Sequence, residues 1–367
     1  MKNKKIMILC KMLGVLMFGS LTFCGTESPV ALAKGSAEQM VVDQAFRGND
    51  GGVSDGIAHY KTLAIALEEA EKLAPGKLEI FVRPGIYREK VLIKRPDLVL
   101  IGEDVQRTQI VFDDAEGTLV RQIDGGDGET CYVMDCASVT IADTAINFQA
   151  KNITFSNDFD TVKNSKTMKN HQAFALRNEA DRSSFFACRF LGRQDTLYAN
   201  KGRQYYKNCY IEGDVDFVFG GADAVYDGCE IHSLQREGVN GGFVTAPSTL
   251  AKDKGFLFYR CRLTGDETLK HIVKLGRPWH PSSETRPVNS AAVFKECTMG
   301  EHISPQAWSS MKNKYALFQP EDNRLFEYDS TGAGAEQNKN RRYLDEMQAK
   351  ACTIPAYLGN WVPTEIE

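Results

Sequence analysis

One short pattern recurs around the cysteines of this 367-residue chain. An aromatic or apolar stretch is followed by a short turn, a cysteine, a polar residue, an apolar residue and usually a glycine. The pattern surrounds Cys188, Cys209, Cys229, Cys261 and Cys297, at intervals of 21, 20, 32 and 36 residues. Short alternating strands that recur at a period of about 20 residues are typical of a β-solenoid, in which longer intervals carry inserted loops.

The repeated cysteine falls at one angular position of such a coil and points into the core. We therefore expect these five cysteines to be free buried thiols that stack in a ladder, rather than disulfide partners. The state of Cys131 and Cys136, five residues apart, and of Cys352 stays open. No C-x-x-C pair is present and the six histidines are scattered, so the sequence does not indicate a metal site.

The rest of the chain fits a capped solenoid. Residues 60–73 have Leu63, Leu67, Ala70 and Ala74 on one helical face, and this helix would cap the open end of the coil stack. Strands are predicted at 78–82, 90–93 and 98–101, and a polar, partly helical region at 332–350. The predicted fold is all-β, with a short N-terminal capping helix.

The N-terminus has the features of a secretory signal peptide. Lys2, Lys4 and Lys5 precede an apolar run over residues 12–24, and an A-x-A cleavage signal ends at Ala33. The sequence thus predicts a signal peptide at 1–33 and a single secreted domain at 34–367, since no Pro/Ser linker divides the remainder. Its thirteen-residue apolar run is too short for an ordinary membrane span, and no second long run exists.

A lipoprotein anchored at Cys24 is the competing interpretation of this segment. It is disfavoured because Phe23 occupies the position where lipid-anchoring signals have a small residue. The formal net charge of the whole chain is -4, and removing residues 1–33 leaves 40 basic and 47 acidic residues, or -7. An acidic chain of this kind is not expected to bind nucleic acid.

Four polar residues recur at the coil period. Gln172 and Gln194 are 22 residues apart, and Gln194 and Asp216 are also 22 apart, with Asp195 beside Gln194. We expect these side chains at one angular position on adjacent coils, about 4.8 Å apart. Taken singly, each of these residues has a structural explanation, as part of an amide ladder or as a carboxylate exposed to solvent. Together, two aspartates within apolar sequence indicate a site where desolvation separates two carboxyl pKa values, giving one acid and one nucleophile or base.

Five sequence blocks resemble the signature blocks of the pectin methylesterases. They stand in the family's order at residues 85–89, 172–176, 194–197, 216–220 and 275–279, within a similarity that runs from about Val42 to Trp361. The resemblance implies a right-handed parallel β-helix, which agrees with the repeat. It also implies a secreted pectinesterase, a carboxylic ester hydrolase that releases methanol from the C6 methyl esters of pectin, or homogalacturonan.

The resemblance also implies roles for individual residues. Asp216 would attack the ester carbonyl, and Gln172 and Gln194 would donate hydrogen bonds to the oxyanion. Asp195 would give its proton to the leaving methoxide and then activate water, while Arg277 would pair with Asp216. This chemistry needs no metal and no organic cofactor.

Substrate contacts follow from the same resemblance. Trp279, Phe219 and Tyr198 would offer apolar faces to sugar rings. The family's Thr and Ser-Ala-Thr stretch has no clear counterpart in residues 128–140, so its contact belongs to Thr130 or is absent. Residues 158–169 form a polar loop expected beside the site. A capped solenoid of this type is expected to be a monomer.

Rival functions remain open. Gly52–Gly56 matches G-x-S-x-G, but a polar turn precedes it instead of a buried strand, so we interpret Ser54 as a loop residue. A carboxylate pair could also cleave glycosidic bonds, although two amides favour an acyl oxyanion. The remaining alternatives are a non-catalytic glycan-binding protein and a relative acting on another ester or a thioester.

Overall fold

The computed structural model describes residues 38–121, 129–164, 170–236, 238 and 240–366. The chain divides into two units, Met1–Ser36 and Ala37–Glu367, and all the described residues belong to the second. The predicted signal peptide at 1–33 and Cys24 lie outside the described residues.

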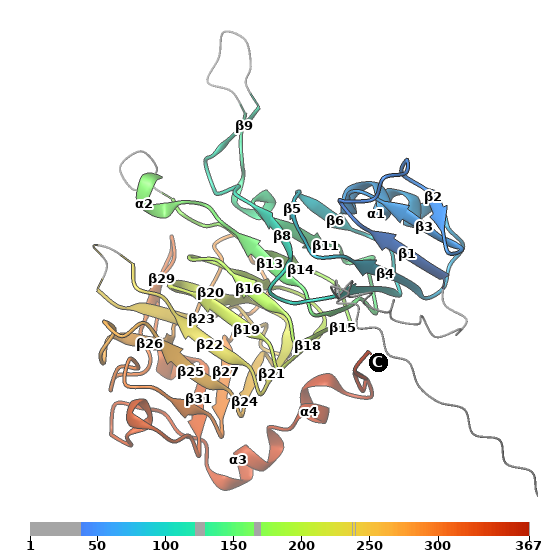
Figure 1. Ribbon diagram of the computed structural model, residues 1–367. Helices are drawn as coiled ribbons and strands as arrows, with labels where there is room; N and C mark the ends of the chain where they lie inside the picture. The colour runs from blue at the N-terminus through green and yellow to red at the C-terminus, as the bar shows by residue number, and fades with distance from the viewer. Residues whose placement is uncertain (1–37, 122–128, 165–169, 237, 239, 367) are drawn as a thin grey trace, which may run out of the picture. The chain divides into compact units, whose positions relative to one another are not determined.

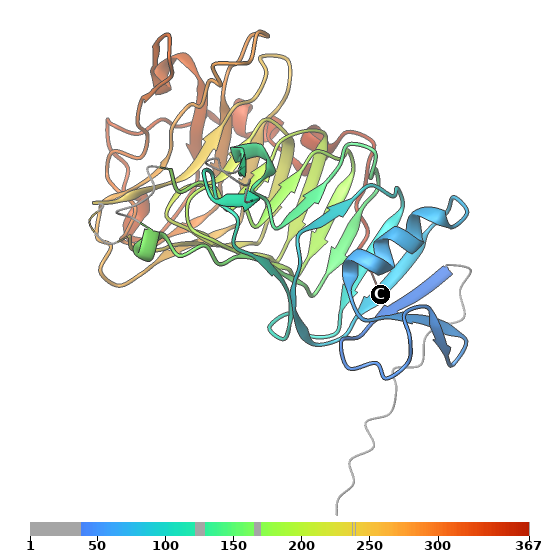
Figure 2. The ribbon, with the colours of Figure 1, turned by 90° about the horizontal axis from the view of Figure 1, so that it is seen from above.

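Three parallel sheets form the body of this unit, and successive strands visit them in turn. One coil consists of β15 in sheet A, β16 in sheet B and β17 in sheet C, after which β18 returns to sheet A beside β15. Apart from the antiparallel pair β2–β3 at the N-terminal edge of sheet A, each strand pairs in parallel with its neighbours, so the coils stack on one another (Figures 1 and 2). The fold is therefore the predicted right-handed parallel β-helix.

The strands are as follows. Sheet A contains, in spatial order, β2 (Gly52–Ser54), β3 (Ile57–Tyr60), β1 (Glu38–Val42), β4 (Leu78–Val82), β7 (Leu98–Gly102), β12 (Gln149–Lys151), β15 (Ser183–Phe186), β18 (Arg203–Lys207), β21 (Asp223–Asp227), β24 (Phe256–Tyr259), β27 (Ala291–Lys295) and β31 (Arg324–Tyr328). Sheet B contains β28 (Thr298–Met299), β25 (Arg262–Gly265), β22 (Glu230–Ser233), β19 (Tyr210–Gly213), β16 (Arg189–Leu191), β13 (Thr154–Asn157), β8 (Thr108–Phe112) and β5 (Gly85–Arg88). Sheet C contains β26 (Val273–Gly276), β23 (Gly242–Pro247), β20 (Val215–Gly220), β17 (Leu197–Ala199), β14 (Leu176–Asn178), β11 (Val139–Ile141) and β6 (Val91–Ile93).

Smaller elements complete the described residues. Two further antiparallel pairs lie outside the three large sheets: β9 (Leu119–Arg121) with β10 (Glu129–Thr130), and β29 (Met311–Lys312) with β30 (Leu317–Phe318). The helices are α1 (Leu63–Lys72), α2 (Thr161–Asn164), α3 (Glu346–Ala351) and α4 (Ile354–Leu358), with short 3-10 turns η1 (Val133–Asp135), η2 (Pro320–Asp322) and η3 (Ala333–Ala335). The β9 strand and α2 project from the coil stack on the same side (Figure 1).

A single left-handed residue makes the bend between sheet A and sheet B in most coils. These residues have φ between 50° and 64° and directly precede the repeated cysteine or, in one earlier coil, an isoleucine: Asn152, Ala187, Asn208, Gly228, Arg260 and Glu296. Only glycine and, less readily, asparagine adopt this conformation without notable cost, so packing of the flanking strands must hold the other residues there.

Two ladders fill the interior beside these bends. The five repeated cysteines are buried free thiols, as predicted, and their Sγ atoms contact backbone carbonyls, as Cys229 does with Tyr206 O at 3.3 Å. The aromatic residue before each bend stacks on its counterpart in the next coil, with ring centroids 4.3–4.9 Å apart, in the series Phe185, Tyr206, Tyr226, Phe258 and Phe294. This spacing matches that of neighbouring strands.

The first coil is closed by α1, three residues later than the sequence predicted. Tyr60 ends β3, and the Thr62 hydroxyl caps the helix by accepting from Ile65 N at 3.3 Å. Ala74 lies beyond the last turn and does not belong to the buried face, which consists of Leu63, Ala66, Leu67 and Ala70. These residues pack into the main core and cover the end of the stack, as expected of a cap.

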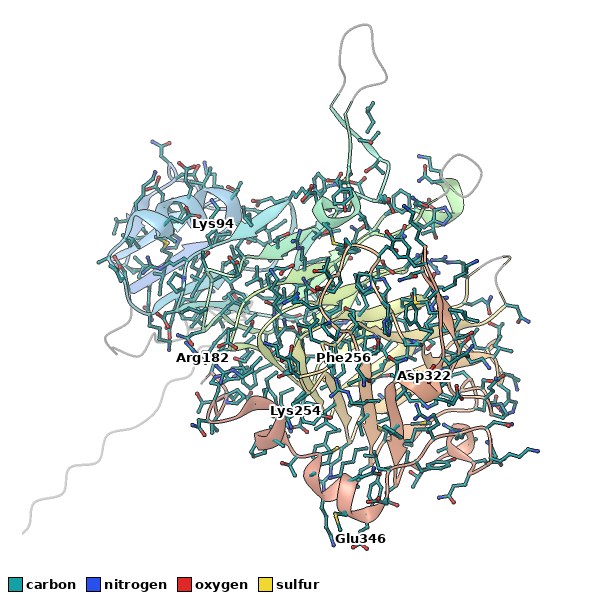
Figure 3. All side chains as sticks on the ribbon, turned by 180° about the vertical axis from the view of Figure 1, so that it is seen from behind. Lys94, Arg182, Lys254, Phe256, Asp322 and Glu346 are labelled. Carbon is teal, nitrogen blue, oxygen red and sulfur yellow. The ribbon has the colours of Figure 1, made fainter. Side chains whose placement is uncertain are left out.

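The C-terminal segment covers the outer face of sheet A. Tyr357 and Leu358 of α4 pack with apolar residues of that face such as Val225 and Leu257. Phe256 of β24 is fully buried, whereas Glu346 of α3 projects from the surface (Figure 3). The predicted strands correspond to β4, β6 and β7, and the region 332–350 contains η3 and most of α3. Within the described ranges, no helix is long and apolar enough to cross a membrane.

Candidate active site

The predicted carboxylates lie at sheet C, where β17 and β20 are neighbours: Asp216 is within β20, and Asp195 lies two residues before β17. The pairing of Leu197 with Val218 places Asp195 level with Asp216, and Asp195 N donates to Val215 O at 3.0 Å. Gln194 is therefore level with Val215, and the expected 22-residue alignment of Gln194 with Asp216 is wrong by one position. The correction matters because it puts the two carboxylates, rather than an amide and a carboxylate, directly opposite each other.

The coil before this one contains one extra residue. Gln172 pairs with Gln194 in an isolated parallel bridge at the predicted spacing of 22, whereas Leu176 pairs with Leu197 at 21. Thr196 O accepts from both Ala175 N and Leu176 N, at 2.8 and 3.3 Å, so two residues of the earlier coil lie opposite one residue of the later coil. A local bulge of this kind re-aims side chains next to a site and cannot be read from a regular period.

Both carboxylates stand on left-handed backbone. The φ angles of Asp195 and Asp216 are 65° and 51°. Aspartate tolerates this region better than most residues, yet it is still uncommon there. Such conformations gather at functional sites, where the surrounding structure holds them in place.

Arg277 binds the Asp216 carboxylate with two nitrogen atoms. Its Nε lies 2.9 Å from Oδ1 and its Nη2 lies 2.5 Å from Oδ2. The guanidinium is itself held over the Phe243 ring, 4.0 Å from the centroid, and Arg277 N donates to Thr245 O. The pair is mostly buried, with 9% of the Asp216 side chain and 24% of the Arg277 side chain exposed. Bidentate geometry fixes both the charge and the orientation of Asp216.

The electrostatics separate the two carboxyl groups. Burial, and then the neighbouring charge of Asp216, raise the pKa of Asp195 well above its usual range. Burial also raises the pKa of Asp216, but hydrogen bonds from Arg277 and its positive charge oppose that shift. A proton shared between the two therefore resides on Asp195, which leaves Asp216 ionised.

The two amides have different surroundings. Gln194 Oε1 accepts from Arg236 Nη1 at 3.2 Å, so the NH2 group of Gln194 is left to face the pocket. Arg236 is anchored by the fully buried carboxylate of Asp214, at 2.6 Å from Nη2 to Oδ1 and 2.9 Å from Nε to Oδ2. Gln172 Oε1 is buried and has no hydrogen-bond partner among the described residues.

These groups surround one cavity of about 270 Å³. Seven of the eight residues predicted from the sequence line it: Gln172, Gln194, Asp195, Asp216, Phe219, Arg277 and Trp279. Tyr198 is the exception. Its ring stacks on Phe219 at 4.4 Å and it is only 6% exposed, so it supports Phe219 from a neighbouring pocket and offers little open face to a sugar.

Sequence reasoning missed several residues of this site. Val133 and Met134 of η1, with Glu116, Ala246 and Met311, line the cavity, whereas Thr130 does not. Arg236 has no motif around it, and only its contact with Gln194 reveals it. Ser54 ends a strand of the N-terminal antiparallel β2–β3 pair, far in sequence from the cavity residues and not among them, in agreement with its interpretation as non-catalytic.

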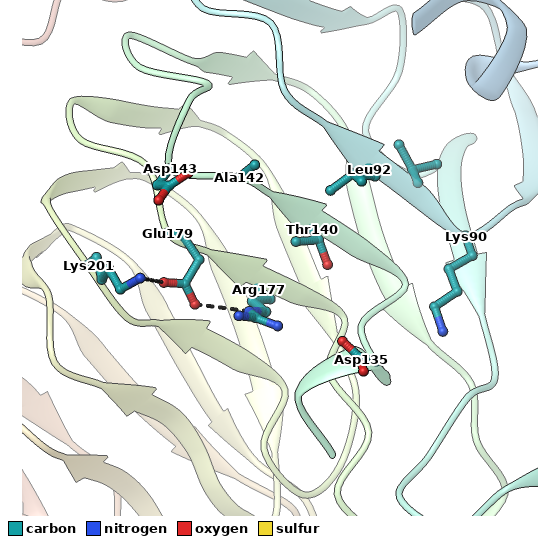
Figure 4. Close-up of a pocket in the computed structure, with 10 residues that line it drawn as sticks. Lys90, Leu92, Asp135, Thr140, Ala142, Asp143, Arg177, Glu179 and Lys201 are labelled. Atoms are coloured by element: carbon teal, nitrogen blue, oxygen red, sulfur yellow. Dashed lines mark hydrogen bonds and ion pairs between the residues drawn. The ribbon is translucent and has the colours of Figure 1, made fainter. Parts of the chain in front are cut away.

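A polar groove adjoins the cavity along β14, β11 and β6. Glu179 accepts from Arg177 at 2.9 Å and from Lys201 at 2.8 Å, and Figure 4 shows Asp135 between Arg177 and Lys90 in this view. Arg177 Nη1 also donates to Met134 O at 2.6 Å, so the η1 turn borders both the groove and the cavity. The described part of the chain contains no cluster of three His, Cys, Asp or Glu residues that could hold a metal ion.

Comparison with known proteins places this geometry in context. A family model described as Pectinesterase matches residues 52–355. Pectinesterase A of Dickeya chrysanthemi is 36% identical over 333 residues, which cover 83% of this chain and 88% of that protein.

Solved structures show the same likeness. Pectin methylesterase PemA from Erwinia chrysanthemi superposes with a TM-score of 0.77 at 32% identity, covering 90% of this chain and 99% of that one. A pectin methylesterase in complex with a hexasaccharide superposes with a TM-score of 0.78 at 32% identity, over 89% of this chain and 98% of that one.

Proposed function

Because the chain belongs to the pectinesterase family, we propose that it removes methyl esters from the C6 carboxyl groups of galacturonosyl residues in pectin and releases methanol through an aspartyl acyl-enzyme. The observation that supports this mechanism is that two carboxylates lie opposite each other on neighbouring coils but have different partners. Asp216 forms an ion pair with Arg277. Asp195 forms no such pair with an arginine among the described residues, and its pKa is raised more strongly than that of Asp216.

In the first step the ionised Asp216 attacks the ester carbonyl. Arg277 keeps this carboxylate charged and aimed by holding both oxygens. The carbonyl π electrons move onto oxygen, and the amide NH2 groups of Gln172 and Gln194 donate to this oxyanion. Arg236 fixes the Gln194 end of the arrangement by engaging its Oε1.

In the second step the tetrahedral intermediate collapses to an anhydride between Asp216 and the galacturonosyl carboxyl. The C–O bond to methoxide breaks, and Asp195 donates its proton so that methanol leaves. Asp195 is then a carboxylate next to Arg277 and Arg236, whose charges lower its pKa and so offset part of the effect of burial.

In the third step water hydrolyses the anhydride. Asp195 accepts a proton from the water as it attacks the galacturonosyl carbonyl, and the same amides hold the second oxyanion. Asp216 leaves as a carboxylate, Asp195 is protonated again, and the free galacturonate departs. The attacking water supplies the proton that restores Asp195, and the new carboxyl group gives its remaining proton to solvent as it leaves as galacturonate.

We further propose that the protein acts as one β-helix domain, residues 34–367, exported after cleavage near Ala33, and that it works as a monomer on a polysaccharide. The long stack of coils and the elongated arrangement of cavity and groove along sheet C favour a chain-like substrate. The partly exposed Trp279 provides the apolar part of the binding surface. Phe219 lines the cavity but is only 3% exposed, so its ring, 5.6 Å from that of Trp279 between centroids, mainly supports Trp279.

The test is methanol release from highly methylated pectin, with Asp216→Ala beside the wild type and the surface variant Asp322→Asn as a matched control. Methanol from the wild type and the control, but not from Asp216→Ala, is expected. Methanol from all three would remove Asp216 from the mechanism. New reducing ends without methanol would show glycosidic cleavage instead, and turnover only of other esters or thioesters would reassign the substrate.

A further inference from the structure

Two cysteines outside the core ladders lie in unusually close contact. The Sγ atoms of Cys131 and Cys136 are 2.6 Å apart, and the two side chains are 5% and 0% exposed. This separation is well inside that of unbonded sulfur atoms and approaches the covalent distance of about 2.0 Å. Cysteines five residues apart therefore face each other across a single tight turn, η1.

We propose that Cys131 and Cys136 form a reversible disulfide that clamps the η1 turn, and that this clamp shapes one wall of the active-site cavity. The effect on catalysis rests on the function proposed above, whereas formation of the bond does not.

The turn between the two cysteines forms part of the wall of the active-site cavity. Val133 and Met134 line the cavity and pack beside the aromatic cluster that contains Phe219, while Asp135 lines the adjacent polar groove. Met134 also borders the neighbouring pocket that Tyr198 lines. A shift of this one turn would alter three hollows on the substrate face at once.

The two ends of the turn are anchored, but its tip is weakly held. Cys131 N donates to Thr118 O at 2.8 Å, and Asn157 Nδ2 donates to Cys136 O at 3.3 Å. Between these points, Arg177 Nη1 donates a hydrogen bond to Met134 O, and Val133 and Met134 are otherwise held by apolar packing. Tyr132 at the tip is 64% exposed. A covalent link at the base would therefore restrict Val133 and Met134 more than the existing hydrogen bonds do.

The surroundings make the pair reactive. The hydrogen bond from Cys136 and the nearby positive charge of Lys90 lower the pKa of Cys131, while the same interaction and burial raise the pKa of Cys136. Of the two thiols, Cys131 is therefore the one whose thiolate form is favoured, and the thiolate is the form that attacks a disulfide. The five ladder cysteines lie in the core inside the coil stack, and none of them lines the cavity, the groove or the neighbouring pocket.

The reaction balances as an exchange with a disulfide-bearing oxidant, either a small molecule or a thiol oxidoreductase. The Cys131 thiolate attacks one sulfur of the oxidant and releases its other sulfur as a thiolate. Cys136 then gives up its proton, attacks Cys131 Sγ in the mixed disulfide and releases the second thiolate. Two protein thiols are oxidised and one oxidant disulfide is reduced to two thiols. Because both sulfurs are buried, the exchange takes place before the turn closes or while it swings out.

Peptide mapping tests the bond directly. Trypsin releases residues 122–151 as one peptide that contains Cys131, Cys136 and no other cysteine. The folded, full-length protein is equilibrated in mixtures of oxidised and reduced glutathione, quenched with acid and analysed by mass spectrometry. We expect this peptide two hydrogen atoms lighter at the oxidising end and doubly alkylated after reduction. A dithiol peptide at every glutathione ratio would overturn the proposal, whether or not the protein hydrolyses pectin.

Kinetics test the clamp. Reduction is expected to raise KM for pectin about two- to tenfold, the range that corresponds to freeing one ordered side chain. Little change in kcat is expected, because Asp195, Asp216 and Arg277 lie in or beside β17, β20 and β26 and not in the turn. The double variant Cys131→Ser/Cys136→Ser should show the raised KM and no response to reductant. Cys352→Ser, in the C-terminal segment, should respond as the wild type does. An oxidised peptide with KM unchanged on reduction would overturn the clamp.

Discussion

Asp195 and Asp216 lie level on neighbouring coils, yet only Asp216 is bound by an arginine. Both carboxyls are buried enough to raise their pKa values, and Arg277 opposes the rise at Asp216 through hydrogen bonds and charge, but at Asp195 through its charge only. Two identical side chains thereby acquire opposite protonation states from their surroundings. This asymmetry gives the site an acid and a nucleophile, and it governs the first two predictions.

The pH dependence of kcat/KM should follow the two carboxyls. Activity requires Asp216 ionised and Asp195 protonated, so Asp216 sets the acidic limb and Asp195 the alkaline limb. Arg277→Lys removes the bidentate contact and part of the opposition to burial, so the pKa of Asp216 rises and the acidic limb moves to higher pH. The surface variant Arg260→Lys serves as control. An acidic limb that stays in place in Arg277→Lys would contradict this assignment.

Asp195→Asn should raise the thermal stability of the protein at neutral pH and lower its rate of methanol release. Because folding raises the pKa of Asp195, the folded state binds its proton more tightly than the unfolded state, and the carboxyl progressively destabilises the fold as pH rises above its unfolded value. The neutral amide removes this penalty, so thermal unfolding at neutral pH should shift upward relative to wild type, with no gain at a pH where Asp195 is protonated in both states. Methanol release should fall about 10²- to 10⁴-fold. Equal gains at both pH values would contradict the linkage.

Arg236 should act through Gln194. Arg236→Lys loses the contact to Gln194 Oε1, and kcat should fall by about tenfold or more if the amide is released. Gln194→Ala should cause a similar fall, and the double variant should be little worse than either one, because the two residues serve one function. Additive losses in this cycle would show that Arg236 acts independently of Gln194.

Arg236→Ala has a separate expected effect on stability. Asp214 is fully buried, and this substitution leaves its charge with only the longer contact to Arg193 at 3.5 Å. Breaking a buried pair costs about 3–5 kcal/mol, which urea unfolding would detect. Unchanged stability would mean that water replaces the guanidinium.

Two tyrosines of the aromatic ladder can be compared by removing the hydroxyl group of each and measuring the effect on stability. Tyr226 OH is buried without a hydrogen-bond partner among the described residues, whereas Tyr206 OH donates to Gln204 Oε1 at 2.7 Å. Tyr226→Phe should raise the free energy of unfolding by about 1–3 kcal/mol, because an unsatisfied buried group disappears. Tyr206→Phe should lower it by about 1 kcal/mol or more, because Gln204 loses its partner. Denaturant unfolding of both variants measures the contrast, and a loss in Tyr226→Phe would contradict it.

Much of the fold was predictable because its information is local. The cysteine repeat reports the bend between sheet A and sheet B once per coil, and β4, β6 and β7 appear as apolar runs in the chain. The start of α1 was predicted three residues too early because Tyr60 fits both a helical face and the end of β3. The left-handed bends at Ala187, Arg260 and Glu296 were not predictable, since nothing in these side chains favours that conformation.

The site was predicted in its membership but not in its alignment. The spacing of 22 residues holds for Gln172 and Gln194 because the coil of Gln172 has one extra residue at Ala175–Leu176. The next coil has the register of 21, which brings Asp195 opposite Asp216. A repeat period averages over such an extra residue. Tyr198 was assigned an open face, and only its packing on Phe219 shows that this face is covered.

By itself, the sequence determined the coil, its period, its inward cysteines and the residue types available on sheet C, because strand alternation and turn spacing are properties of neighbouring residues. The tertiary structure alone decided which of these residues meet. Arg277 reaches Asp216 across 61 positions, and Arg236 reaches Gln194 across 42. The same stacking buries both aspartates and pairs only one of them, and protonation depends on this environment rather than on the residue type.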